Sequence, residues 1–158
     1  MRMVDKRCRL AGAILVAFVI ACGASALALG QGGAQAGATL YKRLGGFDAI
    51  TAVVDDFVPR LVADPQLGRF FVGHGNDSKG RIRQLVAELV CQATGGPCVY
   101  LGRPVKTAHG GLGITESDWQ TMVKHFVATL DKFKVQQKEK DELLAIVGGL
   151  KADIVEKR

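Results

Sequence analysis

Several kinds of residue and motif are rare or missing in this chain. Cysteine occurs four times in 158 residues, which is too few for a fold that disulfides hold together in place of a hydrophobic core. Four prolines and twenty glycines without a repeat do not fit a collagen or a coiled coil. The motifs Gly-x-Ser-x-Gly, His-Glu-x-x-His and the Walker phosphate loop are absent, and the three histidines are not spaced as zinc ligands. These absences argue against the common hydrolase, nucleotide-binding and zinc sites.

The net charge of +6 arises largely at the amino terminus. Four of the 21 basic and one of the 15 acidic residues lie within residues 1–22, so the rest of the chain has 17 basic and 14 acidic residues. The remaining basic residues are scattered, apart from the stretch 132–140, which is typical of a solvated helix face. The charge pattern therefore predicts no nucleic-acid partner.

The first residues have the pattern of a secretory signal. Basic residues within 2–9 precede the uncharged apolar run 10–21, and this order is typical of export. Three endings remain open: lipidation at Cys22, cleavage after an Ala-x-Ala site, or an uncleaved membrane anchor. We interpret residues 1–38 as a signal peptide or lipoprotein signal followed by a flexible linker. We expect an exported protein of the periplasm or cell envelope, with a membrane tether through the N-terminus as one alternative.

Residues 39–158 form the expected folded domain, in which apolar residues recur at helical spacing. The pattern predicts an all-α domain without strands. Thr115 is the expected N-cap of a long helix that runs to residue 133, and Pro59 should kink its helix or open one backbone bond. The expected helical segments are 40–44, 47–63, 78–92, 104–109, 116–133 and 138–155.

One function that suits such a domain is to bind a planar cofactor in its interior. Haem iron takes a neutral imidazole nitrogen on one side, and the macrocycle needs an apolar slot. A lone histidine on an apolar helical face is more often part of the core than a ligand, so the spacing alone does not decide.

Seven short motifs follow one another along residues 40–155: Leu40–Gly46, Asp55–Phe57, Ala63–Pro65, Phe70-Phe71, Thr94–Pro97, Tyr100–Arg103 and Ala108–Thr115. In this order, with glycine pairs between the helices, they resemble the truncated haemoglobins of group I. The resemblance implies a truncated globin, a two-on-two helical sandwich around haem b, which binds a diatomic gas such as oxygen, NO or CO at a five-coordinate iron.

The resemblance also implies the residues of the cofactor pocket. His109 matches the proximal histidine that binds the iron, and Phe71 matches the phenylalanine that packs on the porphyrin. Tyr100 falls where the family places a residue near the haem edge. Trp119 and Met122, one helical turn apart, fall where pocket walls are expected, with an ordinary core position as the alternative for both.

The gas-binding side departs from the family pattern. Group I proteins that hold oxygen tightly usually carry a tyrosine directly after the phenylalanine of the second helix. Here that phenylalanine is Phe57, which is itself a candidate residue of the cofactor pocket, and it is followed by Val58. Counting back from the glycine pair 95–96 gives Ile82 and Val86 at two distal positions, where glutamine is common. These three aliphatic side chains have no donor, and a charge-assisted hydrogen bond contributes about 1.5–3 kcal/mol. We therefore expect weak or fast-releasing oxygen binding and poor nitric-oxide dioxygenation, with a smaller effect on CO or NO.

Three other polar residues have alternative interpretations. The loop at 74–77 is longer than in the family, and a shifted helix register would bring Gln84 toward the iron. His74 is an alternative sixth iron ligand, although a solvated loop histidine is the simpler interpretation. We expect His125 to be structural.

Cys91 and Cys98 flank the Gly-Gly-Pro turn. They could form a structural disulfide, two independent buried thiols, or a redox switch beside the haem pocket. We prefer the structural disulfide because an oxidising cell envelope favours it, and it requires the two Cα atoms to lie within about 7 Å.

The leading interpretation is a gas-binding haem protein with an apolar distal pocket. One alternative is a redox, peroxidase-like or NO-detoxifying enzyme that uses the same iron, although no distal acid–base residue is evident. Another is a haem carrier or gas sensor of the cell envelope, although no signalling domain is visible. No reductase partner can be identified.

Overall fold

The computed structural model describes residues 37–156 of the chain. The predicted export signal, the lipidation at Cys22 and nearly all of the linker fall on residues 1–36 and lie outside the described residues. Within the described part, no helix is both long enough and apolar enough to span a bilayer.

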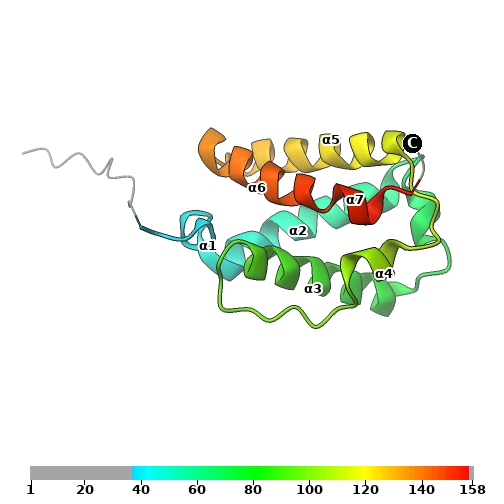
Figure 1. The fold of residues 1–158 in the computed structure, drawn as a ribbon, viewed down its shortest axis with the longest axis horizontal. Helices are drawn as coiled ribbons and strands as arrows, with labels where there is room; N and C mark the ends of the chain where they lie inside the picture. Colours follow the sequence, from blue (N-terminus) through cyan, green and yellow to red (C-terminus); the bar gives the residue numbers. More distant parts are fainter. Residues whose placement is uncertain (1–36, 157–158) are drawn as a thin grey trace, which may run out of the picture. The chain divides into compact units, whose positions relative to one another are not determined.

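Seven α-helices and one 3₁₀ helix make up residues 37–156, and no β-strand occurs in this range (Figure 1). The all-α prediction is therefore confirmed. In chain order the elements are α1 (Leu40–Arg43), α2 (Gly46–Ala63), the 3₁₀ helix η1 (Gly68–Phe71), α3 (Asn76–Ala93), α4 (Val105–His109), α5 (Glu116–Lys132), α6 (Gln137–Gly149) and α7 (Lys151–Ile154).

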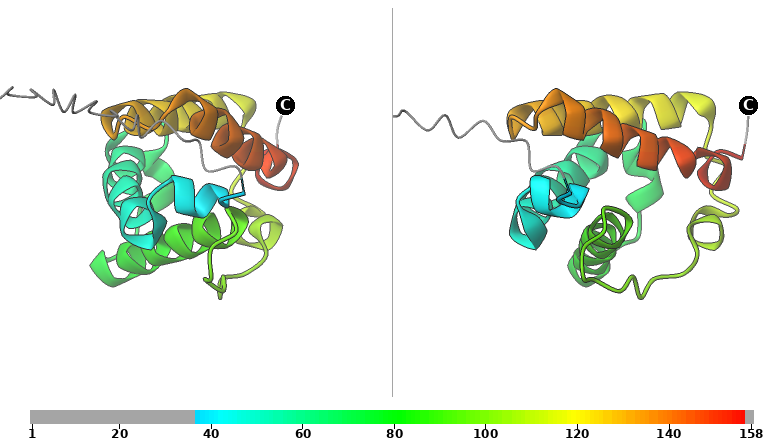
Figure 2. Two further views of the ribbon diagram at one scale, coloured as in Figure 1. Left: turned by 90° about the vertical axis from the view of Figure 1, so that its left-hand side faces the viewer. Right: turned by 60° about the vertical axis from the view of Figure 1, so that its left-hand side comes forward.

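The helices form two layers (Figures 1 and 2). In one layer α2 packs against α3, and α2 also contacts α5 of the other layer. In that second layer α6 and α7 run alongside α5. The short helix α4 lies beyond α3 and contacts α7. This is the two-on-two sandwich expected from the sequence.

Aromatic packing fixes α2 against α5. The rings of Phe57 and Phe126 have centroids 5.2 Å apart and are tilted by 60°. Both side chains are buried, as are the neighbouring Val54 and Leu130. Burying an apolar side chain of this size contributes about 1.5–3 kcal/mol. The two layers are therefore held together at one end by an apolar core.

The start of α5 has the predicted N-cap. The Thr115 hydroxyl accepts the Asp118 N–H at 3.2 Å, and the Asp118 carboxylate accepts the Thr115 N–H at 2.9 Å, which is a capping box. Gln66 and Arg69 also donate to this carboxylate, at 2.8 and 2.7 Å. Burial raises the pKa of Asp118, but the hydrogen bonds from Thr115 and Gln66 and the charge of Arg69 outweigh it and hold the pKa below its usual value. This network links the segment around η1 to the helix that carries Trp119.

The end of α2 is set by Asp64, as the sequence predicts. Its carboxylate accepts the N–H groups of Gln66 and Leu67 at 2.8 and 2.9 Å, and it pairs with His125 Nε2 at 2.8 Å. The bond to His125 is the main reason that the pKa of Asp64 lies below its usual value. His125 therefore joins α5 to the end of α2, in agreement with its expected structural role.

Pro59 is exposed and lies inside α2, which ends at Ala63 as expected. Two helix boundaries differ from the sequence expectation. The helix expected from residue 78 begins at Asn76, because Asp77 suits the first turn of a helix. The helix expected over 138–155 is interrupted at Leu150, directly after a glycine pair that weakens helical structure.

Candidate functional site

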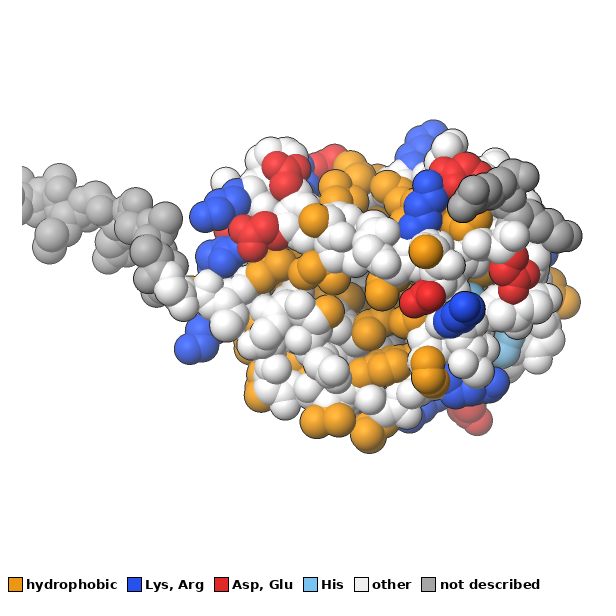
Figure 3. All heavy atoms as spheres, in the orientation of Figure 1, with side chains coloured by type: hydrophobic (Ala, Val, Ile, Leu, Met, Phe, Trp, Pro, Cys, Tyr) orange, Lys and Arg blue, Asp and Glu red, His pale blue; other side chains and the backbone are white. Residues whose placement is uncertain are grey.

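A large apolar cavity lies among the helices. Its volume is about 630 Å³, within the range of cofactor and ligand pockets and far above the voids that packed interiors leave. In the view of Figure 3, hydrophobic side chains gather at the middle of the face, between the layer of α6 and α7 and the segments of α3 and α4. All nine residues proposed from the sequence line this one cavity: Phe57, Val58, Phe71, Ile82, Val86, Tyr100, His109, Trp119 and Met122.

His109 is the last residue of α4 and has a defined tautomer. Its Nδ1 lies 2.8 Å from the Val105 carbonyl oxygen, one helical turn earlier. Because a carbonyl only accepts, Nδ1 carries a proton, and in the neutral ring the lone pair is therefore on Nε2. The backbone thus orients the ring of His109, which is one of the residues that line the cavity. With Nδ1 protonated, Nε2 is the nitrogen that can bind a metal. Pro104, directly before the helix, fixes the point where the turn begins.

The walls formed by α2 and α3 lack hydrogen-bond donors at the three positions that the sequence singled out. Val58 on α2 is buried, and Ile82 and Val86 on α3 are half-buried. Gln84 does not line the cavity; its exposed side chain bonds to Arg81 and Glu88 on the helix surface. The alternative in which a register shift brings Gln84 into the pocket is therefore wrong.

Phe57, Phe71, Trp119 and Met122 form further parts of the wall. Trp119 is buried and Phe71 is half-buried at the end of η1. Trp119 and Met122 are therefore cavity residues as well as part of the packed interior. Their positions suit contact with a flat apolar ligand.

The polar residues of the lining are few. Besides His109 they are His74, Tyr100, Arg103 and Asp118, and the last of these is satisfied by its capping network. Arg103 is the only arginine or lysine among the lining residues. His74 is exposed, so it stands at the rim of the cavity, as a solvated loop histidine would.

Two hydrogen bonds and a close approach hold Tyr100 at the cavity edge. Its N–H donates to Gln92 Oε1 at 2.6 Å, and its hydroxyl donates to the Arg103 carbonyl at 2.8 Å. A Cβ atom at Gly102 would overlap the Tyr100 ring, so the glycine allows the chain to fold over the tyrosine. The same turn brings Arg103 to the cavity.

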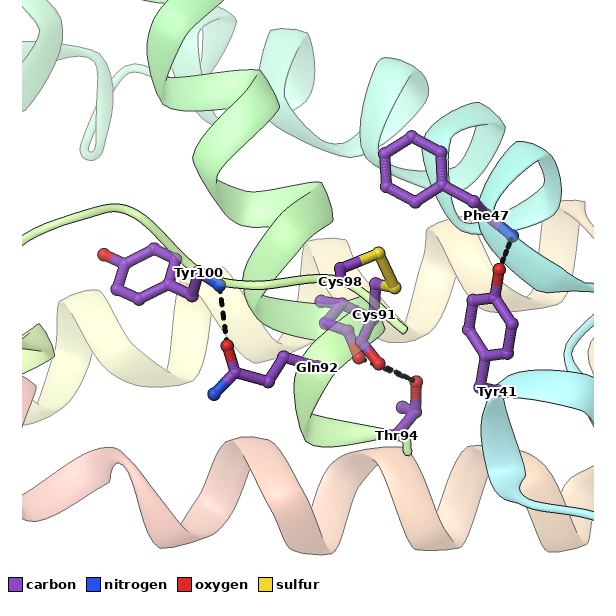
Figure 4. Close-up of a disulfide and its surroundings, with 8 residues drawn as sticks. Tyr41, Phe47, Cys91, Gln92, Thr94, Cys98 and Tyr100 are labelled. Atoms are coloured by element: carbon purple, nitrogen blue, oxygen red, sulfur yellow. Dashed lines mark hydrogen bonds between the residues drawn. A yellow bond between two sulfur atoms is a disulfide. The ribbon is translucent and has the colours of Figure 1, made fainter. Parts of the chain in front are cut away.

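Cys91 and Cys98 form a disulfide, with Cα atoms 5.8 Å apart (Figure 4). Cys91 is fully buried at the end of α3, and Cys98 begins the segment that leads to Tyr100. The preferred interpretation of these two cysteines as a disulfide is confirmed. The bond fastens the segment between α3 and α4, which contains the cavity residues Tyr100 and Arg103.

Sequence reasoning missed several cavity residues near α4 and the C-terminus. Arg103, Leu112, Ile114 and Ile154 all line the cavity. Arg103 belongs to a motif that the sequence singled out, but no side-chain role was assigned to it. Leu112 and Ile114 had no distinguishing signal, because isolated apolar residues next to glycines are common in loops, and Ile154 belongs to a helical pattern that gives no sign of which residue faces a cavity.

Comparison of the sequence with known proteins identifies a family. The family model described as "Bacterial-like globin" matches residues 39–156. The group 1 truncated hemoglobin GlbN of Mycolicibacterium paratuberculosis is 33% identical over 117 residues, which cover 74% of this chain and 84% of that protein. The group 1 truncated hemoglobin GlbN of a Nostoc species is 32% identical, over 75% of this chain and 98% of that protein.

Solved structures give the same comparison. The 2/2 hemoglobin of Synechococcus sp. PCC 7002, in the cyanomet state and with covalently attached heme, has a TM-score of 0.64 and 30% identity, over 70% of this chain and 91% of that one. The truncated hemoglobin of Tetrahymena pyriformis has a TM-score of 0.69 over 76% of this chain and 100% of that one; at 24% identity it bears on the fold alone.

The disulfide predicts a stability difference between oxidised and reduced protein. Closing a loop of this length removes conformational freedom from the unfolded chain, and the chain-entropy model gives about 2.5 kcal/mol. We expect dithiothreitol to lower the free energy of unfolding in urea by about this amount. The double variant Cys91→Ser, Cys98→Ser is the control and should not respond to the reductant. Equal stability of the wild-type chain with and without reductant would contradict the prediction.

Proposed function

Since this chain belongs to the bacterial-like globins, as a group 1 truncated haemoglobin that binds haem b, we propose that it binds diatomic gases at the haem iron with His109 as the protein ligand. The observation that carries the proposal is the state of His109. Its Nδ1 is held by the Val105 carbonyl and its Nε2 keeps a lone pair at the wall of a large apolar cavity.

The residues of the cavity fit the cofactor. When bound, haem supplies an iron atom with a coordination position open to a gas molecule. Phe57, Phe71, Trp119 and Met122, which line the cavity, offer apolar surface to the macrocycle. Arg103 offers a positive charge at the cavity for the carboxylates of the haem propionates.

The aliphatic side chains of α2 and α3 determine how strongly the pocket stabilises each bound gas. Oxygen is polarised when it binds iron and is stabilised by a nearby donor, whereas CO and NO are less dependent on one. Val58, Ile82 and Val86 line the cavity and provide no donor. We propose that the protein releases oxygen quickly and discriminates little against CO. The same lack of an acid–base group at these positions counts against a peroxidase-like role.

Replacing His109 tests the iron ligand. His109→Gly removes the proposed bond but leaves space for a free imidazole, so the iron–histidine stretching band in the resonance Raman spectrum of the reduced protein should disappear. Added imidazole should restore a band of this kind. His125→Gln, which alters a half-buried histidine outside the cavity lining, is the matched control. An unchanged band in His109→Gly would reject the assignment.

Adding a donor to α2 tests the apolar pocket. In Val58→Tyr the hydroxyl should slow oxygen dissociation by about 10- to 100-fold, the equivalent of one charge-assisted hydrogen bond. Val58→Phe adds the same ring without the hydroxyl and should not slow it in this way. Stopped-flow measurement of oxygen release decides between them. The proposal fails if wild type already releases oxygen as slowly as Val58→Tyr, or if the two variants behave alike.

A further inference from the structure

The segment that follows His109 has few contacts of its own: Ile114 is buried, and the Leu112 N–H donates to the His109 carbonyl at 3.3 Å. Residues 110–114 lie outside any helix and include three glycines. Gly111 and Gly113 have φ values of 82° and 66°, in the left-handed region where glycine is favoured. Such a segment loses much conformational freedom when it becomes ordered, so specific contacts are needed to fix it.

Glu156, far away in the sequence, provides these contacts. Both Gly111 and Gly113 donate their N–H groups to the two carboxylate oxygens of Glu156, the second at 2.7 Å. The Glu156 N–H in turn donates to the Ile114 carbonyl at 2.9 Å. Backbone N–H groups that converge on an anion form charge-assisted hydrogen bonds, which are stronger than neutral ones. The C-terminal end of the described chain thus holds the loop through three bonds.

The helix before Glu156 is itself fixed beside α4. α7 contacts α4 (Figure 1), and its Ile154 is one of the residues that line the cavity. Lys151 at its start pairs with Glu116 of α5 at 2.8 Å. Glu156 therefore follows, two residues on, a helix that contacts α4 before the loop and pairs with α5 after it.

The three hydrogen bonds between Glu156 and residues 111–114 are called the clamp below. The loop connects this clamp to the cofactor site. Gly110 follows His109 directly, while Leu112 and Ile114 line the cavity. A shift of the loop would change the end of α4, where the Val105 carbonyl holds His109 Nδ1. We propose that Glu156 is a positioning residue for the iron ligand, and that its carboxylate fixes the ring of His109 and so helps retain haem. This inference rests on the proposed role of His109.

The test compares Glu156→Ala and Glu156→Gln in the haem-loaded full chain. Asp153→Ala is the matched control, because Asp153 is an exposed carboxylate on α7 that forms no ion pair or side-chain hydrogen bond within residues 37–156. The readouts are the iron–histidine stretching band of the reduced protein and the rate of haem transfer to excess apomyoglobin. Circular dichroism verifies that each variant is folded.

We expect Glu156→Ala to shift or broaden the band and to speed haem transfer by about 5- to 10-fold, less than a buried charge-assisted bond would give because the carboxylate is exposed. Glu156→Gln keeps one acceptor and should fall between Glu156→Ala and wild type, and it serves as the decisive variant if Glu156→Ala does not fold. Asp153→Ala should match wild type.

Two failures can be told apart. If His109→Gly abolishes the band but both Glu156 variants match wild type in band and haem transfer, the clamp is wrong and the proposed function stands. If His109→Gly leaves the band unchanged, the proposed ligand is wrong, and the clamp proposal fails with it.

Discussion

The contact between apolar side chains and a large planar cofactor is the interaction on which the rest of this structure depends. Folded proteins pack their interiors to the density of organic crystals and tolerate few voids larger than a water molecule. A cavity of about 630 Å³ lined almost entirely by apolar residues is much larger than such voids. The elements meet around it: α2 and α3 supply aliphatic and aromatic walls, α4 supplies His109, α5 supplies Trp119 and Met122, and α7 supplies Ile154. With haem b bound in this cavity, the apolar interior of the protein is complete.

The three long helices α2, α3 and α5, which form much of the cavity wall, could be predicted from the sequence. Helical spacing identified α2, α3 and α5, because each must bury one apolar face, and Thr115 marked the start of α5 by its capping chemistry. The positions of His109 and the pocket residues came from resemblance to a family, and all nine of them line one cavity. Spacing alone could not have separated a ligand histidine from a core histidine.

The features that the sequence did not reveal depend on residues far apart in the chain. Glu156 lies more than forty residues from the glycines that it binds, and nothing in the local sequence of either segment indicates the pairing. The spacing of Cys91 and Cys98 left three interpretations open, because it permits a disulfide without requiring one, and the structure contains the disulfide. Arg103 appeared only as part of a turn motif, and its place at the cavity depends on how Gly102 folds the chain over Tyr100. Two helix boundaries also differ from the predicted ones. α3 begins earlier, where an aspartate suits its first turn, and the last predicted helix is interrupted after a glycine pair.

The central proposal is that Val58, Ile82 and Val86 make the gas-binding side of the haem pocket apolar, so that it offers no hydrogen bond to the ligand. The C–O stretching frequency of the CO-saturated reduced protein reports this directly, because a nearby donor draws electron density toward the oxygen and weakens the C–O bond. The structure predicts one band at the high-frequency end of the range for haem proteins, with the same position in H₂O and D₂O. A band at lower frequency that moves on transfer to D₂O would show a donor beside the gas and would contradict the account.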